Sequence, residues 1–413
     1  MDMSIINKKV SSFATPFYLF DCIRMLDNIT RLRNLFSYPE TDFFYSLKTN
    51  DFIPLLRLLE KNGMQCEVES SKGLELARKI GFRKIIFNGV AKTSAELELA
   101  CKKNDCIVII DNLDELYALE NITKNKIQVG LRIGIVQSHM YKFGMQKEDF
   151  IEAVEYIYAS EILDLGGFHF HVGSFVLDIM VFKRALTKLS DYMHSVPKKF
   201  FESVKFINIG GGFPCEGKIK KTIFEKILDT YVFRYSFVNM LLLREEQKNK
   251  YEKEQFDSEV YLSSLSKIIQ EYFKDYCKMV GHKVNLFLEP GTVISGNAFD
   301  VYAKVVRIKR NMVFLDVSRF IEHGYMIYNH FIYNYTRPSN EINSALIFGP
   351  LGTNNDLFSR VYQGERLQVG DIVRIASMGA YTYSTRKSFV KSQPTVLIKK
   401  GDFIEPYMER SGK

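Results

Sequence analysis

Eight short apolar runs lie between residues 43 and 289, and each ends at a polar residue or a glycine. The runs are Phe43–Leu47, Gln65–Glu69, Lys84–Phe87, Cys106–Ile110, Ile127–Ile133, Leu165–Phe170, Val204–Ile209 and Val284–Leu288. Their length and apolar character are typical of strands buried in a protein core. The residues at their ends are Lys48, Ser70, Asn88, Asp111, Arg132, His171, Gly210 and Glu289.

Helix-like segments separate these runs. One covers Ser71–Ile80 and stops before Gly81, and Thr93 and Glu96 have the spacing of a capping box at the start of another. Strands that alternate with helices pair in parallel, and eight such repeats predict a (β/α)8, or TIM, barrel. In such barrels the chemistry lies at the C-terminal ends of the strands. We therefore expect the residues at the ends of the runs to form one site.

The pattern changes to short strands after Gly291, which predicts a second, all-β domain. The predicted strands are Ala298–Val306, Asn311–Asp316, Leu346–Phe348, Asp371–Ala376 and Thr395–Lys399, and Pro16–Phe20 is a strand that could join them. We place the barrel at residues 30–292 and the β domain at residues 1–29 and 293–413. Residues 231–266 contain many charged residues and interrupt the alternation of strands and helices. We interpret them as a surface insertion in the seventh crossover.

Composition narrows the class of protein. With 413 residues, 46% of them hydrophobic, the chain can bury a large core, and its lysines are spread widely enough that the net charge of +8 does not predict nucleic-acid binding. No run approaches the roughly 18 apolar residues of a membrane span, and no secretory signal is visible, so we expect a cytoplasmic protein without membrane attachment. The six scattered cysteines predict free thiols.

Lys48 and the glycines after the seventh run are the first candidates for chemistry. A lysine at the mouth of an apolar strand either reaches water or forms a Schiff base with a carbonyl compound. Gly210, Gly211 and Gly212 leave backbone N–H groups open to a phosphate, or form a tight turn. Phosphate sites in barrels are often built by the loops after strands seven and eight, which favours the phosphate.

His171 and Glu289 extend this site. His169 and His171 point to one face of their strand, but without a third ligand nearby they do not predict a metal site. A flat imidazole stacked on a planar cofactor, with Ser174 donating to its phosphate, fits better. Glu289 could cap a helix, or it could pair with the nitrogen of a pyridine ring and make that ring an electron sink.

As an ordered set, the motifs resemble those of the fold-type III pyridoxal-phosphate (PLP) decarboxylases, whose familiar members are diaminopimelate and ornithine decarboxylases. The likeness extends from about Pro16 to Tyr383. The motifs are Tyr45-Ser46-Leu47-Lys48-Thr49-Asn50, Asn88-Gly89-Val90-Ala91-Lys92-Thr93, Lys142-Phe143-Gly144, His171-Val172-Gly173-Ser174, Gly210-Gly211-Gly212, Glu289-Pro290-Gly291 and Gly379-Ala380-Tyr381.

The resemblance implies an alanine racemase-like barrel with a C-terminal β domain, and a homodimer with shared active sites. Lys48 would bond to the cofactor, Glu289 would pair with its ring nitrogen and His171 would stack on the ring. The phosphate would be held by Ser174, Gly211, Gly212 and Tyr381, and Gly291 belongs to the same cofactor-binding set.

The chain also departs from the family pattern. Thr292 stands where the family has arginine, Gly352 stands where it has a cysteine that protonates the product, and Thr353 replaces an acidic residue. Lys48, His323, Tyr325 or water would then supply the proton. Without that acid a diamine substrate is less favoured, and the space at Gly352 predicts a larger, non-diamine substrate. Examples are antibiotic or siderophore intermediates, such as the aminocarboxypropyl group of microcin C type pathways.

Three other functions compete with this hypothesis. The first is a decarboxylase of the diaminopimelate or ornithine type. The second is an amino-acid racemase, which Glu289 speaks against because racemases of this fold set an arginine beside the ring nitrogen. The third is a decarboxylase-like binding protein without catalysis, which would explain Gly352 but not the retention of Lys48, His171 and Glu289 together.

Overall fold

The computed structural model describes residues 12–123, 125–136, 142–220, 225, 227, 237–253, 257–322 and 328–408. The chain divides into two compact units. The first, called here the barrel unit, comprises Arg31–Pro214 and Ser258–Gly291. The second, the β unit, comprises Met1–Thr30, Cys215–Asp257 and Thr292–Lys413. The predicted ranges differ from this division at residues 215–257, which belong to the β unit.

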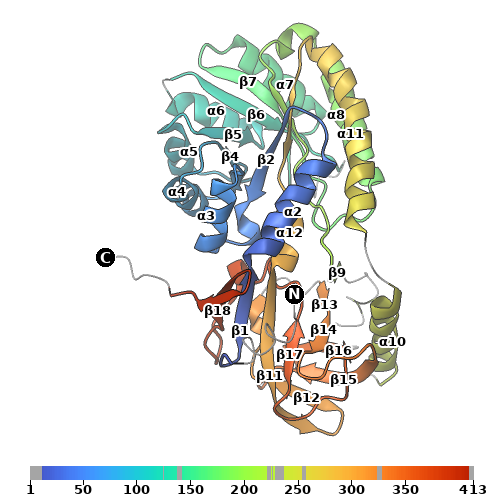
Figure 1. Ribbon diagram of the computed structural model, residues 1–413. Coiled ribbons are helices and arrows are strands. Elements are labelled where there is room, and N and C mark those ends of the chain that lie inside the picture. The colour runs from blue at the N-terminus through green and yellow to red at the C-terminus, as the bar shows by residue number, and fades with distance from the viewer. Residues whose placement is uncertain are drawn as a thin grey trace. The chain divides into compact units, whose positions relative to one another are not determined.

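Eight parallel strands close into a barrel in the first unit (Figure 1), as the sequence predicts. Each predicted run overlaps one strand. In order around the barrel the strands are β10 (Asn285–Leu288), β2 (Thr41–Ser46), β3 (Gln65–Val68), β4 (Ile85–Phe87), β5 (Cys106–Ile110), β6 (Ile127–Arg132), β7 (Leu163–His169) and β8 (Phe206–Asn208).

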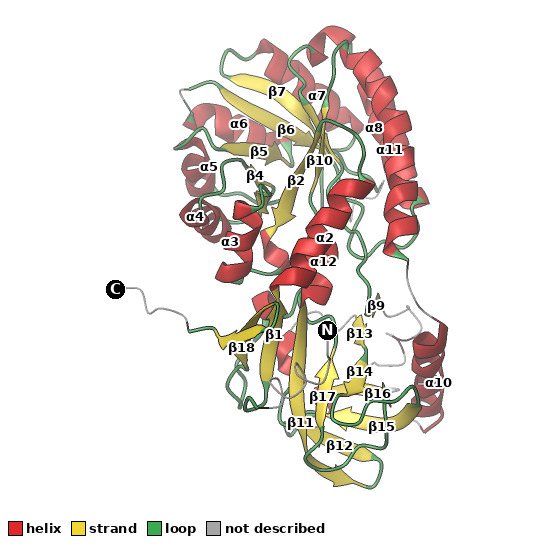
Figure 2. Cartoon of the chain, viewed as in Figure 1, coloured by secondary structure: helices red, strands yellow, loops and turns green. Residues whose placement is uncertain are grey.

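Helices connect successive strands of this barrel (Figure 2). Two predicted helix boundaries are confirmed: α4 ends at Gly81, whose φ of 104° is left-handed, and Thr93 and Glu96 form a capping box. The helices are α2 (Cys22–Leu35, which enters from the β unit), α3 (Ile53–Lys61), α4 (Ser71–Ile80), α5 (Ser94–Cys101), α6 (Leu113–Ile122), α7 (Lys147–Ala159), α8 (Met180–His194) and α11 (Ser258–Val280). None of the helices in the described part of the chain has the length and apolarity of a membrane span.

A cluster of apolar side chains, called here the apolar plug, packs inside the barrel toward the N-terminal ends of its strands. Its buried side chains are Phe44, Ile86, Ile107, Ile109, Phe206 and Phe287. The rings of Phe206 and Phe287 stack with their centroids 4.5 Å apart. Since burial of each large apolar side chain contributes about 1.5–3 kcal/mol, this plug stabilises the strands whose ends carry the predicted site residues.

Nine strands form the main sheet of the β unit. The predicted N-terminal strand joins it, because β1 pairs antiparallel with β11 and parallel with β18. β12 pairs with both β15 and β11, so part of the sheet closes on itself. In sheet order the strands are β12 (Met312–Leu315), β15 (Ile342–Phe348), β16 (Leu357–Gln363), β14 (Ile332–Asn334), β17 (Ile372–Ile375), β11 (Phe299–Lys309), β1 (Phe17–Asp21), β18 (Thr395–Lys400) and β19 (Phe403–Pro406). A separate two-stranded sheet pairs β9 (Lys218–Lys220) with β13 (Tyr328–His330).

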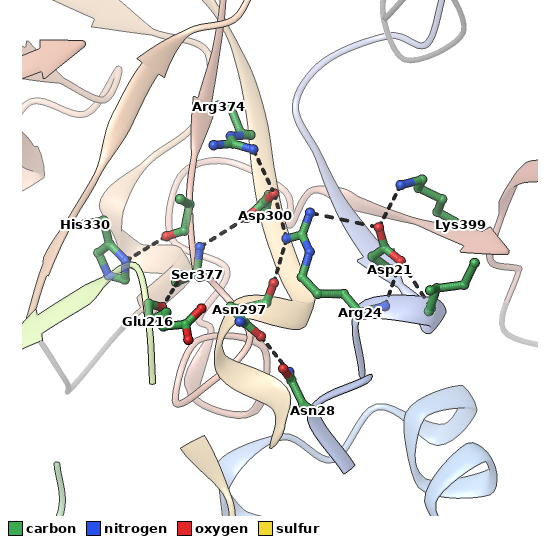
Figure 3. Close-up of polar contacts among 12 residues, drawn as sticks. Asp21, Arg24, Asn28, Glu216, Asn297, Asp300, His330, Arg374, Ser377 and Lys399 are labelled. Atoms are coloured by element: carbon green, nitrogen blue, oxygen red, sulfur yellow. Dashed lines mark hydrogen bonds and ion pairs between the residues drawn. The ribbon is translucent and has the colours of Figure 1, made fainter. Parts of the chain in front are cut away.

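Arg24, in the first turn of α2, ties the start of this helix to the sheet (Figure 3). Its Nη1 lies 3.2 Å from Asp300 Oδ2 and also donates to the carbonyl oxygen of Asn297 at 2.6 Å. Asp21, beside it on β1, pairs with Lys399 Nζ at 2.7 Å. Because Asp300 and Asp21 are almost fully buried, these cations compensate charges that burial would otherwise make costly.

The predicted surface insertion is packed rather than exposed on all sides. Within it, α10 (Phe237–Lys253) lies against β16. Gln247, which is 6% exposed, accepts from the backbone N–H of Arg360 at 3.0 Å, and Lys250 Nζ pairs with Glu225 at 2.6 Å. Part of the charged sequence is therefore buried in contacts within the β unit, and α11 begins within the same predicted segment.

Candidate active site

A layer of polar side chains lies inside the barrel, directly above the apolar plug. Side chains two positions apart on a strand share a face, so the residues two positions after Phe44, Phe206 and Phe287 also point inward. The same spacing from Ile86 and Ile109 gives Asn88 and Asp111, and the strand register places Glu67 beside Ser46 and His169 between Arg132 and Asn208. Each member is at most 6% exposed. The layer consists of Ser46, Glu67, Asn88, Asp111, Arg132, His169, Asn208 and Glu289.

Glu289 is the centre of the hydrogen bonding in this layer. Its Oε1 accepts from Asn208 Nδ2 at 2.7 Å and from Asn88 Nδ2 at 3.5 Å. Burial raises the pKa of this carboxyl to about 7, while the nearby Lys48 charge opposes the rise. Glu289 is thus fixed in position, and a cation placed beside it would hold it ionised.

His169 lies next to Glu289 as a neutral ring. Burial, followed by the charges of Arg132 and Lys48, keeps its pKa well below the usual value. Its Nε2 lies 3.0 Å from Asn88 Nδ2 and accepts from it, so the ring proton belongs on Nδ1. Within the described residues Nδ1 has no hydrogen-bond partner.

Lys48 is carried by a short 3-10 helix, η1 (Leu47–Thr49), at the end of β2. Its Nζ contacts Glu69 Oε1 just beyond β3. Ser46 Oγ donates to Glu67 Oε2 at 2.6 Å, and burial raises the pKa of Glu67 to about 8, with the Lys48 charge opposing. Glu67 Oε1 has no hydrogen-bond partner in the described part of the chain.

The glycine triplet and His171 follow β8 and β7, which lie two and three strands from β2 around the barrel. The N–H of Gly211 points to His171 Nδ1 at 3.3 Å, and burial, together with the Lys48 charge, keeps the pKa of His171 well below its ordinary value. Gly212 has a left-handed φ of 93°. A Cβ on Gly211 would lie 2.1 Å from the carbonyl oxygen of Glu289, and one on Gly212 would lie 2.1 Å from that of Gly173. Only glycine fits this backbone.

The turn after Glu289 lies against the segment that carries Lys48. The Ser46 N–H donates to the carbonyl oxygen of Pro290 at 3.3 Å. A Cβ on Gly291 would lie 2.1 Å from Thr49 Oγ1. The barrel unit therefore gathers most of the predicted site residues at its strand ends: Lys48, His171, Ser174, Gly211, Gly212, Glu289 and Gly291.

The other predicted residues do not belong to this unit. Tyr381, with φ of 57°, and Gly352 and Thr353 lie in the β unit, and their roles stay predictions. Thr353 caps a short 3-10 helix, since its side chain accepts from Asn355 N. A Cβ on Gly352 would meet no atom within 4 Å. His323 and Tyr325 lie outside the described residues.

Glu67, Glu69 and Asn208 were not singled out by the sequence, and His169 was considered only as a possible metal ligand beside His171. All four lie within predicted runs, so the sequence did contain a sign of them. Glu67, His169 and Asn208 lie two or three positions before the polar residue or glycine that ends the run. Two ion pairs support them: Arg132 Nη1 lies 3.5 Å from Asp111 Oδ1 within the polar layer, and Lys92 forms a buried ion pair with Glu115.

These groups match the chemistry of PLP. The cofactor has an aldehyde, a phosphate and a ring with a nitrogen and a hydroxyl group, and the site offers an amine, a glycine backbone that no side chain can enter, and a buried carboxyl. Within the polar layer, three buried polar atoms also have no hydrogen-bond partner among the described residues: Glu67 Oε1, Asn88 Oδ1 and His169 Nδ1. Since buried polar groups are normally satisfied, the residues fit a polar ligand in this position.

Comparison with known proteins agrees with this site. Residues 25–233 match the family model "Pyridoxal-dependent decarboxylase, pyridoxal binding domain". The chain is 25% identical over 402 residues to diaminopimelate decarboxylase of Aquifex aeolicus, covering 92% of this chain and 85% of the relative. It is 23% identical over 409 residues to the Helicobacter pylori J99 enzyme, covering 94% and 90%.

Solved structures show the same fold. Diaminopimelate decarboxylase of Methanocaldococcus jannaschii superposes with a TM-score of 0.81 at 23% identity, covering 98% of this chain and 92% of that one. A Vibrio vulnificus lysine/ornithine decarboxylase complexed with putrescine gives 0.76 at 20% identity, covering 97% and 98%. Because the family model matches half of the chain, this protein belongs to the pyridoxal-dependent decarboxylases and is a PLP-dependent carboxy-lyase.

Proposed function

We propose that this enzyme removes the α-carboxylate of an amino acid at the mouth of its barrel, with Lys48, His171 and Glu289 touching the cofactor. The observation that supports this assignment is the register that packs the turn after Glu289 against the Lys48 segment. It places an amine and a buried carboxyl at the ends of two neighbouring strands, β2 and β10, beside the polar layer. When bound, PLP supplies an electron sink for the electron pair that departing carbon dioxide leaves behind.

Each residue has a distinct task in this proposal. Lys48 would bond to the cofactor aldehyde, and Gly211 and Gly212, with Ser174 and Tyr381, would bind the phosphate through N–H and O–H donors. His171, a neutral ring, would lie flat against the cofactor without adding charge. Glu289 would face the ring nitrogen, held in place by Asn208 and Asn88.

Two substitutions test these assignments. Lys48→Ala should abolish the visible absorbance of the bound cofactor, and an unchanged spectrum would refute the role of Lys48. Glu289→Gln should slow carbon dioxide release far more than it weakens cofactor binding, because the amide cannot hold a positive charge on the ring nitrogen. If carbon dioxide release and cofactor binding weakened by the same factor, Glu289 would not have that electronic role.

For the substrate, we propose a larger, non-diamine amino acid, such as an aminocarboxypropyl-bearing antibiotic or siderophore intermediate. The family resemblance assigns the segment Gly349–Asp356 to substrate recognition. Its one carboxylate, Asp356, is 0% exposed and accepts from Arg319 N at 2.6 Å, Leu351 N at 2.8 Å and Ser318 Oγ at 3.0 Å. Because these hydrogen bonds hold the Asp356 carboxylate inside the protein, the segment has no carboxylate left to bind a distal ammonium.

Diaminopimelate is the second candidate, because relatives that carry this name match over most of their length. Holoenzyme should be incubated separately with diaminopimelate, lysine, ornithine and an aminocarboxypropyl nucleotide-peptide, while carbon dioxide and product mass are followed. Turnover of the nucleotide-peptide alone supports the larger substrate. Faster turnover of diaminopimelate refutes it and leaves the decarboxylase assignment intact.

We further propose a homodimer, since members of the resembling family are dimers that share their active sites. Light scattering during size-exclusion chromatography should give twice the chain mass of 47.9 kDa. A peak at the mass of one chain would contradict this proposal.

A further inference from the structure

Lys48 and Glu69 meet because of the register between two neighbouring strands. Ser46 on β2 pairs with Glu67 on β3, and the chain continues two residues from each to reach Lys48 and Glu69. The amine Nζ and the carboxylate Oε1 are then in direct contact. Glu69 lies outside the motifs that this chain shares with the decarboxylase family, so the family resemblance gives it no role.

This ion pair is open to water, unlike the polar layer beneath it. The Lys48 side chain is 35% exposed and that of Glu69 is 45% exposed, whereas Glu67 is 0% exposed. Other titratable groups in the described part of the chain that interact with Lys48 include Glu67 on β3, Glu289 after β10, and His169 and His171 at the end of β7. Among these acids, Glu69 alone is in a position to exchange protons readily with solvent.

The reaction also requires a proton donor. When a carboxylate leaves as carbon dioxide, the electron pair of the broken C–C bond remains with the substrate, and the α carbon must take up one proton. Gly352 stands where the family resemblance places a cysteine for this purpose, and glycine has no proton to give.

We propose that Glu69 holds the Lys48 amine in its protonated form once it has left the cofactor, and that this ammonium donates the proton to the substrate carbon. This rests on the proposed function. The N–H bond of Lys48 breaks and a C–H bond forms at the α carbon, which leaves Lys48 as a neutral amine. A neutral amine is the nucleophilic form that bonds to the cofactor again. Lys48 is the catalytic residue in this step, and Glu69 positions it.

The role of Glu69 can be measured without turnover. Cofactor-free, full-length protein is treated with acetic anhydride across a pH series, and acetylation of Lys48 is quantified by mass spectrometry. A carboxylate favours the ammonium, so Glu69→Gln should shift the midpoint of labelling about 0.5 pH unit lower, the size expected for a partly exposed ion pair. Glu69→Asp should restore it, and Glu75→Gln, an exposed acid on α4, should leave it unchanged.

The role of Lys48 as donor is tested on the holoenzyme. If the ammonium is the donor, the alkaline limb of the kcat profile should move with Glu69→Gln in the same direction and by the same amount as the labelling midpoint. An unmoved labelling midpoint overturns the role of Glu69, and a moved midpoint with an unmoved alkaline limb overturns Lys48 as donor. Absence of turnover with every substrate instead contradicts the proposed function, which the labelling experiment does not require.

Discussion

Asn208 donates a hydrogen bond from Nδ2 to Glu289 Oε1 at 2.7 Å, between two side chains that are 0% and 4% exposed. The bond joins neighbouring strands at the floor of the site, and Asn208 lies directly beside Phe287, two residues before Glu289. A buried carboxyl depends on such donors for its ionised form, because burial alone favours the protonated acid.

Asn208→Ala should therefore raise the pKa of Glu289 further above its present value of about 7. With a smaller ionised fraction at neutral pH, carbon dioxide release should slow there and recover as pH rises. Loss of the buried bond should also lower the free energy of unfolding by about 1–3 kcal/mol. Activity profiles against pH and urea unfolding measure the two effects, with Asn121→Ala, an exposed residue on α6, as control. An unshifted profile would show that Asn208 does not tune the carboxyl.

Glu67 should make the stability of the cofactor-free protein depend on pH. Its pKa is raised from 4.5 to about 8 in the folded chain, so between these values the folded state binds more protons than the unfolded state. Stability should then fall as pH rises through this window, by up to about 1.4 kcal/mol per pH unit.

Glu67→Gln should flatten that decline, since the amide does not titrate. Urea unfolding followed by circular dichroism at several pH values measures the slope, and Glu98→Gln, an exposed acid on α5, should retain the slope of the unmodified protein. Glu289 adds a smaller decline of the same sign up to about pH 7, so some slope should persist. Equal slopes for the Glu67 variant and the unmodified protein would contradict this account.

The barrel strands were predictable because parallel strands covered by helices are buried on both faces and appear as continuous apolar runs. The polar layer was less visible for a related reason. Ser46, Glu67 and Asn208 lie inside the runs, whereas the predicted site was built mainly from residues at the ends. The period of two placed His169 beside His171, and counting back two positions from Lys48 and Gly210 would have found Ser46 and Asn208 in the same way.

β16 shows what the sequence does not reveal about the β unit. Its residues, Leu357–Gln363, show no alternation, because six of the seven are buried. α10 covers this strand, and Arg360 N donates to Gln247 on that helix. Which helix covers a strand is decided by tertiary packing, so neither β16 nor the buried face of α10 could be inferred from local pattern.

The buried ion pair between Lys92 and Glu115 should be a major support of the site. The two side chains are 1% and 4% exposed, and Lys92 Nζ also donates to the carbonyl oxygen of Ile109 at 2.7 Å. Lys92→Met removes the ammonium and leaves the Glu115 carboxylate buried without its ion-pair partner. This should lower the free energy of unfolding by about 3–5 kcal/mol.

The double variant Lys92→Met with Glu115→Gln should recover part of that loss, because no uncompensated charge remains. Chemical denaturation of both single variants and the double variant gives the coupling energy between the residues. A double variant that loses the sum of the two single effects would show that the pair does not act as a unit. An exposed pair, Lys278 with Asp275, provides the control and should change stability by under about 1 kcal/mol.

Gly212 and Gly352 should respond in opposite ways to the same substitution. At Gly212 the backbone has φ of 93° and a Cβ would lie 2.1 Å from the carbonyl oxygen of Gly173, whereas a Cβ at Gly352 would meet nothing within 4 Å. Gly212→Ala should thus displace the loop whose N–H groups we assign to the phosphate, weakening cofactor binding at least about tenfold and costing about 1–3 kcal/mol of stability. Gly352→Ala should leave both cofactor binding and the melting temperature nearly unchanged. Cofactor titration by absorbance and thermal unfolding compare the two, and equal cofactor affinity in both variants would show that the triplet does not hold the phosphate.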